Sequence, residues 1–227
     1  MCGSVLEREI TMQDLLKIIS DPERVKLGNI EDKYLSDTLG RLKGTAAALV
    51  FPKSTEEVSA VMKFANDRGL PVTPRGAGTN LVGSTVPHGE GIILDFSLMN
   101  RVLEIDEDTF TAVVEPGVVL SELRQQLSKK VLPTAGWDQA SLEAYEEFQE
   151  SPEQFFPTDP TEASACLGGM AACNASGARS YAYGPMRPHI TGLHVALADG
   201  DLLELQRGEA FAQGRHLSLV TAEGHTF

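Results

Sequence analysis

Cysteine is scarce in this chain of 227 residues, which contains only Cys2, Cys166 and Cys173. Three cysteines without a paired pattern do not make a disulfide framework, and reduced thiols fit a reducing compartment. The five histidines are scattered, and neither they nor the cysteines have the spacing of metal ligands. The sequence therefore predicts no metal site and no disulfide-stabilised secreted domain.

Long hydrophobic runs are also missing. No segment approaches the roughly 18 consecutive apolar residues of a membrane-spanning helix. Residues 1–20 lack the basic start and apolar centre of a signal peptide. We therefore expect a cytoplasmic protein, and attachment to the membrane periphery through a partner stays open.

Basic residues are outnumbered, with 19 Lys and Arg against 32 Asp and Glu and a net charge of −13. The stretch 131–178 has no Lys or Arg but eight acidic residues. Because nucleic-acid binding depends on basic groups that neutralise phosphates, we expect no nucleic-acid partner. An anionic cofactor is still compatible with this charge, since backbone N–H groups can hold phosphate without lysine.

What the chain does contain is a glycine-rich loop, Pro74–Gly83, with the sequence PRGAGTNLVG. It follows the apolar, strand-like segment Leu70–Val72. Glycines allow sharp turns and leave N–H groups bare for an anion. We interpret the loop as a phosphate cradle, and the alternative is a surface turn without a ligand.

The spacing of the glycines argues against two well-known phosphate loops. In a mononucleotide-binding loop, lysine follows the second glycine; Gly78 and Gly83 have the right separation, but Ser84 takes the place of the lysine. In a dinucleotide fingerprint, the glycines stand at the first, third and sixth positions, which here are Gly76, Gly78 and Leu81. A nicotinamide-binding Rossmann site is therefore not expected.

Apolar periodicity predicts a mixture of helices and strands. Helical spacing marks 11–20 and 120–127, and Ser54–Gly69 has a capping box, an apolar stripe and a glycine stop. Short apolar runs predict strands at 46–52, 70–73, 92–95, 102–105, 110–114, 190–198 and 202–205. The last two are joined by Asp199-Gly200, a hairpin signal, so we expect an α+β fold.

An acidic segment, Gly136–Phe156, contains the only tryptophan. Leu142, Tyr145 and Phe148 recur every three residues, which predicts a helical surface insertion with a small apolar anchor. A solvated face is favoured over a lid that closes on a ligand. Docking of a basic partner is a further hypothesis for its charge.

A second glycine cluster, Ala165–Gly177, combines helix-forming residues with the adjacent glycines Gly168 and Gly169. Each interior glycine costs a helix about 1 kcal/mol relative to alanine, so something is expected to approach the backbone closely. The approaching group is either another helix packed on small residues or a ligand at the helix start.

Taken together, these motifs resemble a known family. The ordered segments PKSTEEVSAVMKFANDRGLPVTPRGAGTNLVG, LDFSLMNRVLEID, VVEPGV, CLGGMAACNASG, YGPMR and ITGLHVALADG, between Ala47 and Leu205, resemble the FAD-binding domain of the vanillyl-alcohol oxidase and p-cresol methylhydroxylase flavoproteins. The branch that is most similar contains glycolate oxidase large subunits and D-lactate dehydrogenases. The resemblance implies two α+β subdomains that enclose FAD.

The resemblance also implies which residues would contact FAD. The first loop would supply backbone contacts to the pyrophosphate, and the flavin ring would lie by Ile190 and Gly192. The first-loop residues implied are Arg75, Gly76, Ala77, Gly78, Thr79, Asn80 and Gly83. Those implied around the adenine, ribose and pyrophosphate are Pro116, Asp159, Cys166, Gly169, Asn174, Ser176 and Gly177.

The chain departs from the family pattern in two places. Members that bond the flavin to histidine carry that histidine near the first loop, where this chain has Thr79, so we expect non-covalent FAD. Relatives also continue into a C-terminal substrate or cap domain with catalytic histidines and arginines, and this sequence ends at Phe227 before such a domain. Its catalytic residues are therefore unknown, and these residues alone are expected to be inactive.

The expected organisation is an N-terminal helical extension at 1–46 and an FAD-binding domain at 47–227, incomplete at its C-terminal end, with the acidic insertion at 136–156. The expected function is the FAD-binding portion of an oxidoreductase that oxidises a small 2-hydroxy acid of the glycolate or D-lactate type by hydride transfer to FAD. The electron acceptor and any partner subunit are not specified. The alternatives are a non-catalytic flavin-binding or electron-transfer subunit beside a partner chain, and a reductase of the enolpyruvyl-glucosamine type.

Overall fold

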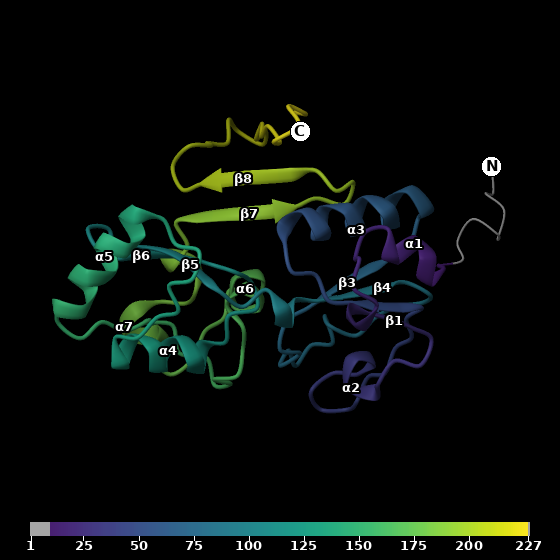
Figure 1. The fold of residues 1–227 in the computed structure, drawn as a ribbon, viewed down its shortest axis with the longest axis horizontal. Helices are drawn as coiled ribbons and strands as arrows, with labels where there is room; N and C mark the ends of the chain where they lie inside the picture. The colour runs from purple at the N-terminus through teal and green to yellow at the C-terminus, as the bar shows by residue number, and fades with distance from the viewer. Residues whose placement is uncertain (1–9, 227) are drawn as a thin grey trace. The chain divides into compact units, whose positions relative to one another are not determined.

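The computed structural model describes residues 10–226, so Cys2 lies outside the described part. The chain divides into two compact units. Unit 1 contains the residues up to Asp95 together with those from Thr191 onward, and unit 2 contains Phe96–Ile190. Both units mix helices with strands (Figure 1), which confirms the α+β fold expected from the sequence.

Unit 1 is built on a four-stranded sheet with the strand order β1-β2-β4-β3. β2 (Ala48–Val50), β4 (Ile92–Asp95) and β3 (Val72–Arg75) run parallel, and β1 (Val25–Leu27) is antiparallel to β2. Every residue of β2 and β4 is buried. Such continuous burial is typical of strands that are covered on both faces of a parallel sheet.

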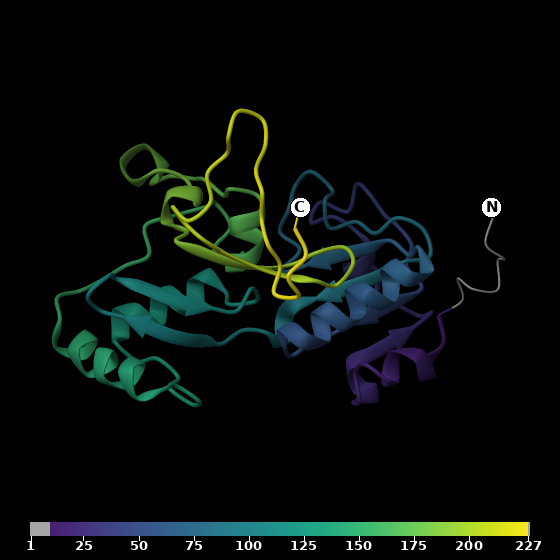
Figure 2. The ribbon, with the colours of Figure 1, turned by 90° about the horizontal axis from the view of Figure 1, so that it is seen from above.

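Helices cover the two faces of this sheet. α3 (Thr55–Arg68) lies on one face and buries its apolar stripe (Figures 1 and 2). On the other face, Leu49 and Ile93 form a buried cluster with Ile30, against which the last two residues of α2 (Asp32–Leu35) pack. Successive side chains of a strand point to opposite faces, which is why alternate sheet residues serve the two layers.

The ends of α3 follow the signals in the sequence. The side chain of Ser54 accepts a hydrogen bond from the backbone N–H of Glu57, and Gly69 ends the helix in the left-handed conformation. The carboxylate of Glu57 bonds the N–H of Lys53 and the guanidinium of Arg24, at 2.7 Å each. The predicted helix is confirmed, and its capping carboxylate also ties the helix to the segment before β1.

The chain returns to unit 1 as the antiparallel hairpin β7 (Gly192–Ala196) and β8 (Leu202–Gln206). The turn contains Gly200 at a positive φ of 91°. Ser59 of α3 donates a hydrogen bond of 2.6 Å to the carbonyl of Gly200, which holds the hairpin against the helix (Figure 1). The hairpin predicted from Asp199-Gly200 is confirmed.

Before β2, the structure contains elements that the sequence did not reveal. These are β1, α2 and the short 3₁₀ helix η2 (Pro22–Arg24). The helix expected at 11–20 is confined to α1 (Met12–Leu16). Segments this short have too few residues for a periodic pattern to stand out.

Unit 2 contains the antiparallel pair β5 (Val102–Asp106) and β6 (Thr111–Val114), both as predicted. Its helices are η3 (Phe96–Leu98), α4 (Leu120–Lys129), α5 (Gln139–Glu150), α6 (Leu167–Ala172), α7 (Ser180–Tyr183) and η4 (Arg187–His189). Within the part of the chain that the structure describes, no helix is both long and apolar enough to cross a bilayer.

The acidic segment is fixed to the core of unit 2 by its aromatic residues. Trp137 is buried and donates from Nε1 to the carbonyl of Val102 at 2.8 Å. Phe148 of α5 is only 2% exposed and belongs to the same apolar cluster. The predicted helix with an apolar anchor is therefore confirmed, with most of its glutamates exposed on the outer face.

Candidate cofactor-binding site

The first glycine loop lies in unit 1, directly after the carboxyl end of β3. Ligands of open α/β sheets bind at the carboxyl ends of parallel strands, so the loop is well placed for a cofactor. Gly78 and Gly83 adopt positive φ values of 71° and 75°. Other residues pay a steric penalty in this region, which accounts for glycine at both positions.

The loop is held in shape by its own polar groups. The side-chain oxygen of Asn80 accepts hydrogen bonds from the N–H groups of Val82 and Ser84, at 2.9 and 3.2 Å. Thr38, from the segment before β2, donates to the carbonyl of Gly78 at 2.5 Å. The side chain of Asn80 thus organises the loop, which leaves its backbone as the candidate for ligand contacts.

Arg75 differs from the other implied residues of this loop. Its side chain is buried, and its Nη2 donates to the carbonyl of Lys33 at 2.6 Å. Burial lowers the pKa of Arg75, while the nearby charge of Asp95 acts in the opposite sense. The guanidinium is therefore directed into the protein and is not displayed to a ligand in solution.

The second glycine cluster lies in unit 2, and its two adjacent glycines have different surroundings. A Cβ on Gly168 would lie 2.5 Å from the Cβ of Pro116, and the N–H of Gly168 bonds the carbonyl of Pro116. Among the residues that the structure describes, a Cβ on Gly169 would meet only the sulfur of Cys166, at 3.4 Å. Close internal packing explains why position 168 is glycine, whereas the exposed face of Gly169 is open to an approaching group.

Asp159 and Gly177 form a second contact region within unit 2. A Cβ on Gly177 would lie 1.8 Å from the carbonyl oxygen of Asp159. The carboxylate of Asp159 pairs with Arg124 at 2.8 Å and with Arg179 at 3.5 Å. One carboxylate thus faces two guanidinium groups, a cluster that the sequence did not reveal.

The remaining implied residues sit close to these regions or to the hairpin. Asn174, at a positive φ of 46°, accepts a hydrogen bond from the N–H of Arg187 at 2.8 Å. Ser176 is exposed, and Ile190 is half-buried at the end of unit 2. Gly192 begins β7 in unit 1, where the amide of Gln206 would collide with a Cβ.

The structure thus separates the implied residues into two sets. Unit 1 holds those of the first loop, Arg75–Asn80 and Gly83, together with Gly192. Unit 2 holds Pro116, Asp159, Cys166, Gly169, Asn174, Ser176, Gly177 and Ile190. The support of the first loop by the side chains of Thr38 and Leu42 and by the carbonyl of Lys33 was missed, because these contacts join segments about 40 residues apart and leave no local pattern.

These residues fit an anionic cofactor. The loop Pro74–Gly83 contains no acidic residue, although the chain as a whole is acidic. Its positive-φ glycines and the open face of Gly169 let a ligand approach the backbone closely. The fit rests on main-chain N–H groups, as expected for a phosphate-containing group.

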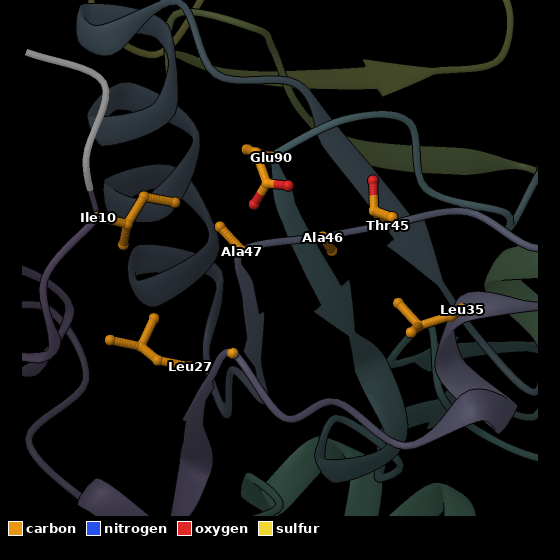
Figure 3. Close-up of a pocket in the computed structure, with 8 residues that line it drawn as sticks. Ile10, Leu27, Leu35, Thr45, Ala46, Ala47 and Glu90 are labelled. Atoms are coloured by element: carbon orange, nitrogen blue, oxygen red, sulfur yellow. The ribbon is translucent and has the colours of Figure 1, made fainter. Parts of the chain in front are cut away.

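A hollow on unit 1 lies elsewhere. It measures about 450 Å³ and opens to solvent beside β1 and β2 (Figure 3). Its lining is mostly apolar, with Glu90 as the charged group, and includes none of the implied cofactor residues. We therefore assign the candidate site from the glycine segments and not from this hollow.

Comparison with known proteins places most of the chain in one family. A profile of the family described as an FAD binding domain matches residues 46–145 and 140–206. Glycolate oxidase subunit GlcD of Bacillus subtilis is 32% identical over 171 residues, which cover 75% of this chain and 32% of the relative. D-lactate dehydrogenase of Archaeoglobus fulgidus is 35% identical, over 77% of this chain and 35% of its own length. The chain therefore spans about a third of the length of these curated relatives.

Solved structures also match most of this chain. An alkyldihydroxyacetonephosphate synthase matches 87% of this chain and 34% of its own, with a TM-score of 0.68 and 25% identity. The 6-hydroxy-D-nicotine oxidase of Arthrobacter nicotinovorans matches 82% of this chain and 36% of its own, with a TM-score of 0.63 and 21% identity. The second likeness concerns the fold alone.

Proposed function

Because the chain belongs to the FAD binding domain family of the vanillyl-alcohol oxidase and p-cresol methylhydroxylase flavoproteins, we propose that it binds FAD and serves the oxidation of a small 2-hydroxy acid. The observation that carries the proposal is the first glycine loop at the carboxyl end of β3 in unit 1. The substrate class comes from relatives named for glycolate, D-lactate and D-2-hydroxyglutarate.

The work of this chain's residues is to bind and orient the cofactor. Backbone N–H groups of Gly76–Asn80 neutralise pyrophosphate charge without a lysine, and Gly169 lets the ligand approach α6 closely. The region of Asp159 and Gly177 takes the adenine and ribose, and Ile190 with Gly192 serves the flavin ring. When bound, FAD supplies the hydride-accepting chemistry.

The attachment of FAD is proposed to be non-covalent. Thr79 stands where the sequence resemblance places the flavin-bonding histidine of other members, and a threonine hydroxyl has no comparable nucleophilic nitrogen. Acid precipitation of the loaded protein should release all flavin into the supernatant. Flavin that stays with the precipitated protein would contradict this part of the proposal.

A second candidate is a non-catalytic flavin-binding subunit that acts beside a partner chain. One relative is named as an oxidase subunit, which favours this reading. Because residues 1–227 alone are expected to be inactive, the two candidates are compared in the FAD-loaded protein together with any residues that its gene encodes after Phe227, by adding glycolate or D-lactate without air. Bleaching of the flavin absorbance supports substrate oxidation, whereas an unchanged spectrum in a flavin-loaded sample supports the subunit.

FAD binding itself is tested with a pair of matched glycine variants. Gly78 and Gly89 have similar φ values, 71° and 69°. A Cβ on Gly78 would meet Arg75 at 2.1 Å, whereas a Cβ on Gly89 would meet no described residue within 4 Å. Both alanine variants carry the same backbone strain. We expect Gly78→Ala to weaken FAD binding, measured by calorimetric titration, at least about tenfold, because a tenfold change needs only about 1.4 kcal/mol.

Gly89→Ala is expected to bind FAD within about twofold of the wild type, because Gly89 lies outside the proposed site. Equal losses in both variants would mean that general backbone strain explains the effect. Unchanged affinity in Gly78→Ala would remove the first loop from the site.

A further inference from the structure

Arg75 is an unusual residue to find beneath a loop of glycines. It is the last residue of β3 and is only 8% exposed. Arginine is almost never buried to this degree without a partner that satisfies its charge. The contacts of its guanidinium therefore indicate what the side chain contributes.

The guanidinium has few compensating interactions. Nη2 donates to the carbonyl of Lys33 at 2.6 Å, and the central carbon lies 5.7 Å from the centre of the Tyr34 ring. Nη1 is buried and has no hydrogen-bond partner among residues 10–226. Asp95 is the neighbouring carboxylate across the parallel register. An unpaired, buried N–H of a charged group costs free energy, so packing alone does not account for an arginine here.

The same guanidinium lies directly against the first loop. A Cβ on Gly78 would fall 2.1 Å from Nη2 and 2.5 Å from the central carbon of Arg75. The guanidinium thus occupies the space that a side chain at position 78 would need, so only glycine fits at that position. A shift of the guanidinium would leave the loop without its underlying support.

The segment before β2 contacts the loop at two further points. The hydroxyl of Thr38 donates to the carbonyl of Gly78 at 2.5 Å, and a methyl carbon of Leu42 lies 2.6 Å from where a Cβ on Gly83 would be. Asp37 stabilises this segment, because its carboxylate accepts from the N–H groups of Arg41 and Leu42. Both positive-φ glycines of the loop therefore contact residues 38–42.

We propose that Arg75 is a positioning residue for the first glycine loop and not a phosphate ligand. Residues 33–42 support both Arg75 and the loop. Its hydrogen bond to Lys33 fixes the guanidinium, which in turn fixes the backbone at Gly78. The buried positive charge also favours an anion above the loop, because a charge acts more strongly in a poorly solvated environment. The role in FAD binding depends on the proposed function, whereas the ordering of the loop does not.

Under this proposal, replacing Arg75 affects the order of the loop and the overall stability differently. Methionine is close to arginine in length and has no unpaired N–H, and replacing buried ionic groups by apolar ones is often neutral or stabilising. Arg75→Met should therefore fold with nearly unchanged thermal stability, but the loop should loosen. A purely structural arginine would instead lose stability and affinity together.

The test compares Arg75→Met and Arg75→Lys with Arg68→Met. Arg68 lies on α3, with its guanidinium carbon 3.9 Å from the Phe64 ring centre, and contacts no residue of the loop in the structure described. Binding of FAD and of ADP, which keeps the pyrophosphate without the flavin, is measured by calorimetry. Amide hydrogen exchange of residues 76–83 is measured without ligand, so that loop order is read independently of binding.

We expect Arg75→Met to weaken binding of both ligands about tenfold or more and to speed exchange in the loop, because the guanidinium that fixes the backbone at Gly78 is gone. Arg75→Lys should recover part of the affinity, and Arg68→Met should stay within about twofold. Wild-type exchange and affinity in Arg75→Met would overturn the proposal. The proposal would also be overturned if Arg68→Met and Arg75→Met lost affinity equally and in proportion to their loss of thermal stability.

A second variant covers the case in which Arg75→Met does not fold. Thr38→Val removes only the hydrogen bond to Gly78 and should speed exchange in residues 76–83 and weaken both ligands about threefold to tenfold. Unchanged exchange there would reject the supporting role of residues 33–42. If the wild type binds neither FAD nor ADP, the proposed function fails, while the exchange rates still decide whether Arg75 orders the loop.

Discussion

The two adjacent glycines of α6 allow a prediction in which neighbouring substitutions have opposite effects. Glycine costs a helix about 0.5–1 kcal/mol relative to alanine. At Gly169 the new Cβ would meet only the Cys166 sulfur, at 3.4 Å, which is an ordinary contact. Gly169→Ala should therefore raise the free energy of unfolding by about 0.5–1 kcal/mol, or the melting temperature by about 1–4 °C.

Gly168→Ala is the matched control in the same helix. Its Cβ would lie 2.5 Å from one carbon of Pro116 and 2.9 Å from the backbone of that residue. Overpacking of this kind costs about 1–3 kcal/mol, which exceeds the gain in helix propensity. The two variants should thus shift the melting temperature of the FAD-free protein in opposite directions, as measured by circular dichroism.

FAD binding should not follow stability in these variants. If the pyrophosphate lies against Gly169, the Gly169→Ala protein should be more stable than the wild type yet bind FAD at least about tenfold more weakly, because the added methyl group takes the place of the ligand. Calorimetric titration measures this. A stabilised Gly169→Ala protein with wild-type affinity would refute the placement of the cofactor on α6. A Gly169→Ala protein that is less stable than the wild type would refute the assignment of an open face at Gly169.

Two further predictions concern stability. Glu57→Gln should lower the free energy of unfolding by about 1.5–3 kcal/mol at pH 7, because Glu57 accepts two hydrogen bonds from Arg24. The Arg24 hydrogen bond lowers the pKa of Glu57 below 4.5, so its contribution is present above pH 4.5 and is lost as the pH falls through the lowered value. Urea unfolding from pH 7 to pH 3 should show the variant converging with the wild type, and a constant gap would contradict the assignment. Phe148→Ala should cost about 3–5 kcal/mol, since Phe148 is 2% exposed in the core of unit 2, whereas Glu146→Gln on the exposed face should cost less than about 0.5 kcal/mol. Equal effects in urea unfolding would show that the apolar anchor does not hold the acidic helix.

The sequence predicted those elements whose signals are local. α3 has a cap, a stripe and a glycine stop, and the β7–β8 hairpin has Asp199-Gly200, so each carries its own evidence within a few residues. β1 has only three residues and is defined by its pairing with β2, which no local pattern records. The same reason explains why short elements before β2 were missed.

The candidate site was predictable in its glycines but not in what surrounds them. Composition alone could not distinguish Gly168, which packs on Pro116, from Gly169, which faces outward. The buried position of Arg75 was equally hidden, because its partner Lys33 lies 42 residues earlier and arginine normally reads as a surface residue. Such distinctions depend on tertiary contacts.

The support of the first loop has a consequence for how this region can change in evolution. Arg75 bonds the carbonyl of Lys33, and Thr38 bonds the carbonyl of Gly78, so two of the acceptors are main-chain atoms. Position 33 could accept many side chains without losing its hydrogen bond, provided that the local backbone is kept. A support built from main-chain acceptors therefore constrains the path of the backbone at residue 33 more than the identity of the side chain there.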